Sequence, residues 1–302
     1  MHVGVTGSSG FIGTALVEAL EERGDSVTRF VRPGSTYSRS VIHWDPARGL
    51  VDEADLKTAG GFDVVVNLAG TGIADKRWNP ARKSEILTSR TSSTSLLVET
   101  LSSLRSPPAV LASGSAIGIY GLRGDEVLDE SSEHGADFLA VVCEKWEAAA
   151  MVLHEGGTRV ALLRTGIVLN RRGGTLKRQI PLFQFGLGGA LGSGRQWLSP
   201  ISLTDEVRGI LWTIDHDIEG PVNLTSPQPL TNREFTKVLA HEMHRPALFQ
   251  VPRLGLDIVL GKELTNNAVL ASQRVVPKVL TETGFSFHNT DIVSIVDDAL
   301  RK

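Results

Sequence analysis

Three residues in the middle of the chain carry side chains that can give or take a proton: Ser115, Tyr120 and Cys143. Cys143 is the single cysteine, and its thiol could act as an acid or a nucleophile. A free thiol has a pKa of about 8.5, so this role needs a neighbouring cation; a small buried hydrophobe is the alternative. The hydroxyls of Ser115 and Tyr120 could hold a substrate carbonyl, whereas a turn serine and a packed ring explain the same residues. We predict all three as candidate catalytic residues.

A second group of residues indicates phosphate binding. In VGVTGSSGFIGTALVEAL, three glycines at a spacing of three follow an apolar run and open an amphipathic one. Glycines at this spacing between a strand and a helix let the backbone turn tightly and approach a pyrophosphate, whose charge meets the positive end of the helix. The segment therefore predicts a dinucleotide site. The expected contact residues are Gly7, Ser8, Ser9, Gly10, Phe11, Ile12 and Gly13.

The end of the next apolar run indicates which dinucleotide fits. In SVTRFVRPGS, Val31 and Arg32 stand where an acidic residue would bind the adenosine ribose hydroxyls of NAD. An arginine at that place can pair with a 2′-phosphate, so Arg32 favours NADP over NAD as the cofactor. A solvated loop arginine is the alternative.

Apolar and amphipathic runs alternate over the first half of the chain. We predict strands near 2–6, 26–31, 62–68, 109–114 and 159–165, and helices near 11–23, 80–104 and 138–154. Such alternation produces right-handed crossovers and a parallel sheet with helices on both faces. The expected fold class is α/β, a Rossmann-type doubly wound parallel sheet with a smaller C-terminal α/β substrate domain.

Beyond about residue 170 the sequence changes character. RRGGTLKRQIPLFQFGLGGALGSG predicts a loop with a short helix, and its last glycines predict a flexible lid, with a tightly packed loop as the alternative. TNREF predicts a helix that opens on a capping box, with Thr231 as N-cap and Glu234 three residues later. We predict an NADP-binding domain at 1–168, to which 203–226 returns, and a smaller substrate or lid domain formed by 169–202 and 227–302.

Composition narrows the possible partners. A net charge of −3 and a pI near 6.3 disfavour nucleic acid and anionic membranes as partners, and no apolar run is long enough to span a bilayer. A single cysteine excludes an internal disulfide and suits a reducing compartment, so we expect a cytoplasmic protein with a small-molecule substrate. HEMH at 241–244 is one residue too short for a His-Glu-x-x-His zinc site, so no metal is expected.

Polar residues on the predicted helices admit two interpretations. Arg77 and Trp78 either face the cofactor or substrate, or form a stacked structural pair. Lys83 and Arg90 fall on the following helix, where a solvated face is the default. Glu147 is an ionisable group on an otherwise apolar helix face, which hydrogen bonds within the sheet–helix packing would explain.

Several stretches resemble the extended short-chain dehydrogenase/reductase superfamily: TGSSGFIG, NLAG at 67–70 and SGSAIGIYG. A closer resemblance, to its epimerase-family (sugar-nucleotide-epimerase-like) subfamily, is carried by NLAGTGIADKRWNPARKSEILTSR, DFLAVVCEKWE, LRTGIVLNRRGGTL, GLGGALGSGRQW and GPVNLTSPQPLTNREF. Together they span nearly the whole chain. The resemblance implies a Rossmann fold, a nicotinamide dinucleotide and, as often in this superfamily, a homodimer. It also implies cofactor contacts at Leu68, Ala69, Gly70, Ser113, Thr165, Gly166 and Ile167.

The proton relay of that superfamily is missing. It uses Tyr-x-x-x-Lys on a helix, where the lysine lowers the pKa of the tyrosine and holds the nicotinamide ribose. This chain has two tyrosines, Tyr37 and Tyr120, and neither has a lysine four residues later. Counting back from Glu147, which resembles the glutamate four residues after the usual lysine, puts Cys143 in the lysine position and Leu139 in the tyrosine position.

The substrate side of the resemblance is also altered. Leu198 and Ser199 stand where nucleotide-sugar enzymes carry Arg and Asp, and Ile167 replaces a substrate-contacting asparagine. Nucleotide-sugar epimerisation is therefore disfavoured. One hypothesis is an NADP-dependent oxidoreductase or isomerase acting on a small, fairly apolar carbonyl compound, with the proton from Ser115, Tyr120 or water. The other is a non-catalytic NADP-sensing or scaffold protein.

Overall fold

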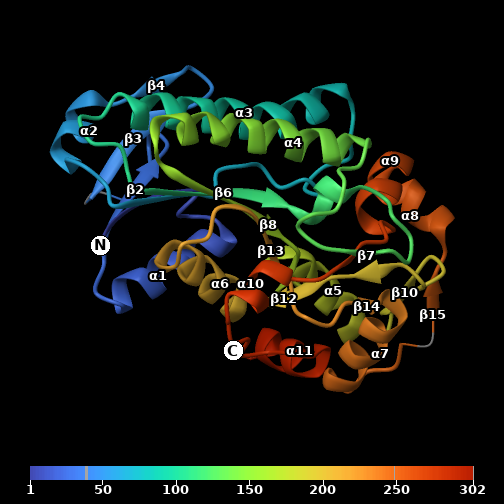
Figure 1. The fold of residues 1–302 in the computed structure, drawn as a ribbon. Coiled ribbons are helices and arrows are strands. Elements are labelled where there is room, and N and C mark those ends of the chain that lie inside the picture. Colours follow the sequence, from blue (N-terminus) through green and yellow to red (C-terminus); the bar gives the residue numbers. More distant parts are fainter. Residues whose placement is uncertain (38–39, 248, 302) are drawn as a thin grey trace.

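An eight-stranded sheet carries the fold (Figure 1), and the computed structural model describes residues 1–37, 40–247 and 249–301. The strand order is β13-β8-β6-β5-β1-β2-β3-β4, with every pair parallel except β3 with β4. This confirms the α/β class and the Rossmann-type parallel sheet. The strands are β1 (His2–Thr6), β2 (Ser26–Val31), β3 (Val41–Asp45), β4 (Leu50–Val51), β5 (Val64–Asn67), β6 (Val110–Ala116), β8 (Arg159–Thr165) and β13 (Gly220–Leu224).

Strand β5 lies inside the sheet, between β1 and β6. All four of its residues are buried, which explains why VVVN shows no alternation of apolar and polar residues. From this point the sheet grows in two directions, through β1, β2 and β3 on one side and through β6 and β8 on the other. Doubly wound folds bind their ligands at such a reversal, beside the carboxyl ends of the strands.

Helices cover both faces of the sheet (Figure 1). The helices α3 (Pro80–Ser102) and α4 (Phe138–Met151) lie on one face, and α1 (Phe11–Glu22) and α6 (Leu203–Asp215) on the other. Each pair of helices packs against the strands and encloses an apolar core. The core on one face includes Leu97 of α3, and the core on the other face includes Leu16 of α1. Asp137 begins α4 by accepting hydrogen bonds from the backbone of Leu139 and Ala140, and the helix ends in a 3₁₀ turn at Val152–Gly156.

Segments after β8 form a separate apolar cluster that includes Leu176, Phe235 and Ile295. The predicted capping box of Thr231 and Glu234 is confirmed at the start of α7. No described helix is long and apolar enough to cross a membrane. The remaining helices and strands of the described chain are α2 (Glu53–Ala59), β7 (Val127–Leu128), β9 (Ile167–Leu169), α5 (Gly174–Gln184), β10 (Gly189–Leu191), β11 (Trp197–Leu198), β12 (Pro200–Ser202), β14 (Leu230–Thr231), α7 (Asn232–Glu242), β15 (Phe249–Val251), α8 (Arg253–Leu260), α9 (Lys262–Leu264), β16 (Arg274–Val275), α10 (Lys278–Glu282) and α11 (Ile292–Leu300).

Two glycines of the segment after α5 are tightly packed. A Cβ on Gly189 would come 2.0 Å from the carbonyl oxygen of Phe249, because β10 and β15 pair there. A Cβ on Gly188 would come 2.5 Å from the ring of Phe183. Gly188 and Gly189 therefore fit the tightly packed alternative, whereas Gly186 has no atom within 4 Å of an added Cβ, and the flexible lid stays a prediction.

Candidate functional site

The backbone of the turn from β1 to α1 lies very close to neighbouring backbone atoms. Gly7 has a φ of +64°, and a Cβ there would lie 2.5 Å from the carbonyl oxygen of Leu68. A Cβ on Gly13 would lie 2.2 Å from the carbonyl oxygen of Gly7. Glycine is therefore required at both positions to bring the turn, the first helix and the loop after β5 together.

The start of α1 offers N–H groups to an anion. The first turn of a helix has backbone donors without intrahelical partners, and the N-cap Gly10 supplies no side-chain oxygen for them. The first turn also carries no acidic residue that would repel phosphate. This arrangement fits the diphosphate of a dinucleotide.

The other predicted contacts around this turn differ in their surroundings. Ser9 is exposed and Ile12 is half-buried, whereas Ser8 is buried. The ring of Phe11 packs against Gly173, where a Cβ would lie 2.3 Å from the ring. Phe11 therefore also joins the start of α1 to the segment that leads into α5.

Arg32 lies exposed just after β2. In the part of the chain that the structure describes, its side chain forms no hydrogen bond or ion pair. Arg29, by contrast, pairs with Glu21 at 3.0 Å and lies 4.8 Å from the centre of the Tyr37 ring. Of these two arginines at β2, Arg32 is the one available to a 2′-phosphate.

Buried hydrogen bonds hold the carboxyl ends of β1, β5 and β6 in place. Thr6 Oγ1 donates to Asn67 Oδ1 at 2.7 Å and accepts from the backbone N–H groups of Leu68 and Ala69 at 3.1 Å. Asn67 Nδ2 donates to Ser113 Oγ at 3.1 Å, and Ser113 is fully buried. Thr6 therefore holds the loop after β5, and the Ser113 hydroxyl is engaged with Asn67.

Ser115 belongs to a buried ion-pair network. Its Oγ donates to Glu147 Oε1 at 2.6 Å, and Arg164 donates to the same carboxylate from Nε at 2.9 Å and from Nη2 at 3.0 Å. Burial alone would lower the pKa of the Arg164 guanidinium, but the hydrogen bonds to Glu147 have the larger effect and raise it. Glu147 is thus hydrogen bonded within the sheet–helix packing, as the sequence suggested, and the Ser115 hydroxyl is already engaged.

Tyr120 belongs to the same network. Its hydroxyl donates to Asn223 Oδ1 at 2.7 Å and accepts from Arg164 Nη1 at 3.1 Å, and the whole residue is buried. Burial raises the pKa of the phenol to about 12. The structure therefore favours the packing interpretation of Tyr120 over a role as proton donor.

Cys143 faces an apolar cluster with Ile117 and Ile119. Burial raises the pKa of its thiol to about 12, so the thiol stays neutral near pH 7. Leu139, at the tyrosine position, is buried as well. The structure favours the interpretation of Cys143 as a small buried hydrophobe.

Residues at the end of β8 meet a buried acid that the sequence did not single out. Thr165 Oγ1 donates to Glu206 Oε1 at 2.8 Å, and Glu206 is fully buried. Burial raises the pKa of Glu206 to about 8. A Cβ on Gly166 would lie 2.5 Å from the carbonyl oxygen of Ser199, and the backbone N–H of Ile167 donates to the same carbonyl. No sequence pattern marks Glu206 as buried, because α6 carries charged residues on both faces.

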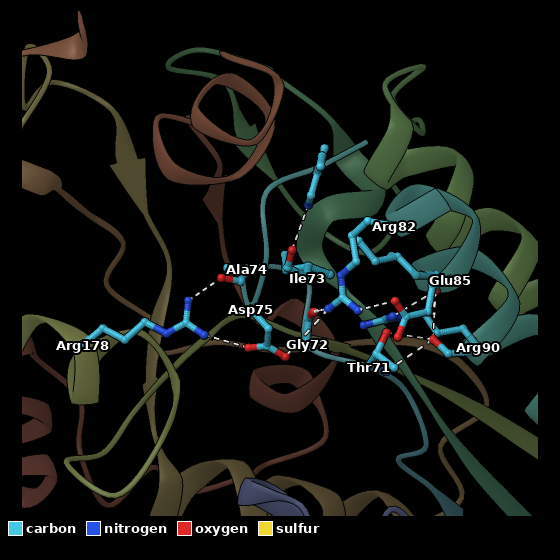
Figure 2. Close-up of polar contacts among 12 residues, drawn as sticks. Thr71, Gly72, Ile73, Ala74, Asp75, Arg82, Glu85, Arg90 and Arg178 are labelled. Carbon is cyan, nitrogen blue, oxygen red and sulfur yellow. Dashed lines mark hydrogen bonds and ion pairs between the residues drawn. The ribbon is translucent and has the colours of Figure 1, made fainter. Parts of the chain in front are cut away.

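The loop after β5 is held between two helices (Figure 2). On one side, Arg82 of α3 donates to the carbonyl oxygen of Gly72 and lies 3.8 Å from Asp75. On the other side, Arg178 of α5 pairs with Asp75 at 2.7 Å and donates to the carbonyl oxygen of Ala74. The loop therefore bridges the sheet domain and α5 beside the dinucleotide site.

Expectations for the polar residues near this loop need correction. Trp78 stacks edge-on against Phe138, with ring centres 5.0 Å apart, rather than on Arg77. Lys83 pairs with Glu263 of α9, so it is not simply solvated. Arg90 is half-buried, and its guanidinium lies 5.1 Å from the centre of the Trp146 ring, where burial lowers its pKa. Helical spacing alone did not reveal these contacts, which come from other elements.

A cavity of about 530 Å³ lies beside β10 and the start of α8. The residues that line it combine amide, hydroxyl and guanidinium groups with apolar ones, so it could accept a small polar molecule. No cluster of three or more potential metal ligands occurs among the residues described. The lining residues are Gly192, Ser193, Gln196, Gln250, Pro252, Arg253 and Leu270.

Comparison with known proteins agrees with this geometry. The profile of the NAD dependent epimerase/dehydratase family matches residues 3–224, and that of a domain of unknown function (DUF1731) matches residues 251–299. Epimerase family protein Mb2239 of Mycobacterium bovis is 41% identical over 291 residues, covering 96% of this chain and 94% of the relative. The chloroplastic epimerase family protein SDR39U1 homolog of Arabidopsis thaliana is 38% identical over 306 residues, covering 100% and 86%.

Solved structures place the fold in the same group. Human epimerase family protein SDR39U1 (isoform2), crystallised with NADPH, superimposes with a TM-score of 0.90 at 30% identity over 99% of each chain. The nucleoside-diphosphate sugar epimerase from Corynebacterium glutamicum superimposes with a TM-score of 0.79 at 34% identity, covering 99% of this chain and 58% of the other. From the glycine turn, the strand order and these matches, the chain belongs to the NAD dependent epimerase/dehydratase family.

Proposed function

We propose that this protein is an NADP-dependent oxidoreductase or isomerase that acts on a small carbonyl compound without a Tyr-Lys pair. The observation that carries this proposal is the dinucleotide cradle, in which Gly7 and Gly13 have no room for a side chain. The choice of NADP rests on the exposed Arg32 after β2. The human relative crystallised with NADPH supports the same choice.

In this proposal the chain binds the nucleotide and orients the substrate, and the nucleotide, when bound, supplies the hydride. The amides at the start of α1 hold the diphosphate, and Arg32 holds the 2′-phosphate. Leu139 and Cys143 present neutral groups where the superfamily has its acid and its cation. The Ser115 and Tyr120 hydroxyls donate to buried acceptors, so the proton for the substrate oxygen comes from water.

The substrate class follows from the residues that replace the usual contacts. Ile167 and Leu198 are apolar where nucleotide-sugar enzymes have asparagine and arginine, and both are half-buried. Ser199, at the Asp position, is fully buried and donates to the carbonyl oxygen of Gln273. These residues cannot provide the charged contacts that a nucleotide sugar needs, which supports a small, fairly apolar substrate.

A fluorescence titration with NADPH and, separately, NADH tests the cofactor. We expect the wild type to bind NADPH more tightly than NADH, and Arg32→Ala to weaken NADPH roughly ten- to hundred-fold, as for a lost charge-assisted contact, with NADH unchanged. A panel of aldehydes, ketones and quinones, followed by NADPH absorbance, then tests the reaction. Failure to bind either nucleotide would contradict the proposal.

The second candidate function, an NADP sensor or scaffold without catalysis, is favoured by one observation. Ser115, Tyr120 and Cys143 are all buried, and the two hydroxyls are engaged in a structural network. In that case nucleotide binding would alter protease cleavage between Gly186 and Gly194. A cleavage pattern that is identical with and without NADPH would count against this function.

A further inference from the structure

Glu206 is an acid buried next to the carboxyl end of β8. Thr165, the last residue of that strand, donates from Oγ1 to Glu206 Oε1 at 2.8 Å. The second carboxyl oxygen, Oε2, is buried and has no hydrogen-bond partner among the described residues. Thr165 is half-buried, whereas Glu206 has no exposed surface. The carboxyl group therefore lies one side chain away from the carboxyl edge of the sheet.

No charged group of the described chain stabilises the ionised form of Glu206. Burial raises its pKa, and only the hydrogen bond from Thr165 acts in the opposite direction. Helix α6, which carries Glu206, packs against α1, α10, β6, β8, β9 and β12. The titratable and charged groups on α6 and on these elements, none of which shifts the pKa of Glu206, are Glu18, Glu21, Glu22, Arg159, Arg164, Asp205, Arg208, Asp215, Lys278 and Glu282.

Thr165 lies towards the nicotinamide end of the dinucleotide in the proposed function. The glycine turn after β1 holds the diphosphate, and Arg32 after β2 holds the adenosine half on that side of the turn. In the sheet order β8-β6-β5-β1-β2, the other half of the dinucleotide therefore extends past β5 towards β6 and β8. Thr165 pairs with Ala116, the last residue of β6, so these two strands end side by side.

The two redox states of the cofactor differ in charge at this end. The nicotinamide ring is cationic in NADP⁺ and neutral in NADPH. A nearby cation favours the ionised form of a carboxyl group and lowers its pKa, and this effect is stronger in a buried environment than in water. Glu206 should respond to such a cation, because no cation of the described chain already compensates its carboxylate.

We propose that Glu206 sets the preference of the site between NADPH and NADP⁺. The neutral carboxyl group favours the neutral ring of NADPH, whereas the carboxylate favours the cationic ring of NADP⁺. Binding of NADP⁺ therefore releases a proton from Glu206 to solvent, and binding of NADPH does not. The inference rests on the proposed function, since it requires a nicotinamide dinucleotide that Arg32 orients. Thr165 acts as a positioning residue, because its hydroxyl holds the carboxyl group behind the site.

The experiment measures the dissociation constants of NADP⁺ and NADPH for the full chain between about pH 6.5 and 9. The ratio of the two constants cancels the titration of the phosphates, which both nucleotides share. The free protein loses the proton of Glu206 near pH 8, and the NADP⁺ complex should lose it at a lower pH. NADP⁺ binding relative to NADPH should therefore tighten roughly five- to tenfold with rising pH, as for a pKa lowered by about one unit.

Three variants assign this change to Glu206. Glu206→Gln has no proton to lose, so its ratio of dissociation constants should not depend on pH. Thr165→Val removes the hydrogen bond that lowers the pKa of Glu206, so the change in the ratio should move to higher pH. Glu18→Gln, on the exposed side of α1, is the matched control and should follow the wild type. Calorimetry of NADP⁺ binding in buffers of different ionisation enthalpy should show proton release in the wild type and none in Glu206→Gln.

The outcomes separate this inference from the proposed function. If the wild type binds neither nucleotide, both fail. If it binds both nucleotides with a ratio that does not depend on pH, this inference alone is overturned. The same holds if the pH dependence persists in Glu206→Gln, because another group would then carry it. Thr165→Val guards against misfolding of the first variant: a change in the ratio at the same pH as in the wild type would also overturn the inference.

Discussion

Glu206 should make the stability of the protein fall with rising pH. The carboxyl group is fully buried, Thr165 donates to its Oε1 at 2.8 Å, and its Oε2 has no hydrogen-bond partner among the described residues. Burial raises its pKa from 4.5 to about 8. Between these two values the folded protein keeps a proton that the unfolded chain has lost, so raising the pH favours unfolding.

The magnitude follows from the shift. Each unit of pKa difference corresponds to about 1.4 kcal/mol, so this group lowers the free energy of unfolding by roughly 3 kcal/mol between pH 5.5 and 7.5. Its stabilising contribution is complete below about pH 4.5 and is lost as the pH rises towards 8, above which the slope from this group ends. Glu206→Gln removes the titration, so the stability of the variant relative to wild type should increase with pH over this window.

Urea denaturation at several pH values measures the effect. Glu18→Gln on the exposed side of α1 is the matched control and should follow the wild type at every pH. The comparison of two proteins at each pH cancels the contributions of other carboxylates, such as Asp25 and Asp55, whose pKa values are lowered in the folded state. Parallel curves for wild type and Glu206→Gln would refute the reasoning, because they would mean that Glu206 is ionised in both states.

Two further predictions concern the residues around the α4 helix. Glu147→Gln leaves the buried Arg164 cation without a carboxylate and should lower the free energy of unfolding by about 3–5 kcal/mol in urea, whereas Glu144→Gln on the exposed face should change it little. Cys143→Ala should lower the free energy of unfolding by about 1 kcal/mol and leave NADPH binding and turnover unchanged, because the thiol is buried and neutral. A variant that binds NADPH normally but no longer turns over would instead show that the thiol is catalytic.

Much of the architecture could be predicted because it depends on local patterns. Five sheet strands, the helices that link them and the capping box at Thr231 follow from short-range periodicity and cap residues. Strands β3, β4 and β13 of the sheet were not predicted from the sequence, because short strands at or next to the edges of a sheet carry weak periodicity. The loss of Tyr-x-x-x-Lys was also visible from spacing alone.

The state of the individual side chains depended on contacts between distant segments. Ser115 meets Glu147 across 32 positions, and Tyr120 meets Asn223 across 103 positions, so neither could be recognised as engaged from its neighbours in the chain. In the sequence Arg90 has the spacing of a surface residue, and only the structure shows that its guanidinium lies between Trp146 of α4 and Gly70.

The sequence by itself determined the strand–turn–helix that receives a dinucleotide, because glycine spacing acts within a few residues. Only the tertiary structure decided which groups near that turn remain available. Burial, hydrogen-bond partners and pKa values arise when distant segments pack together, and they turned Tyr120 and Cys143 into parts of the interior. The same packing placed the Arg90 guanidinium between Gly70 and Trp146, where burial lowers its pKa.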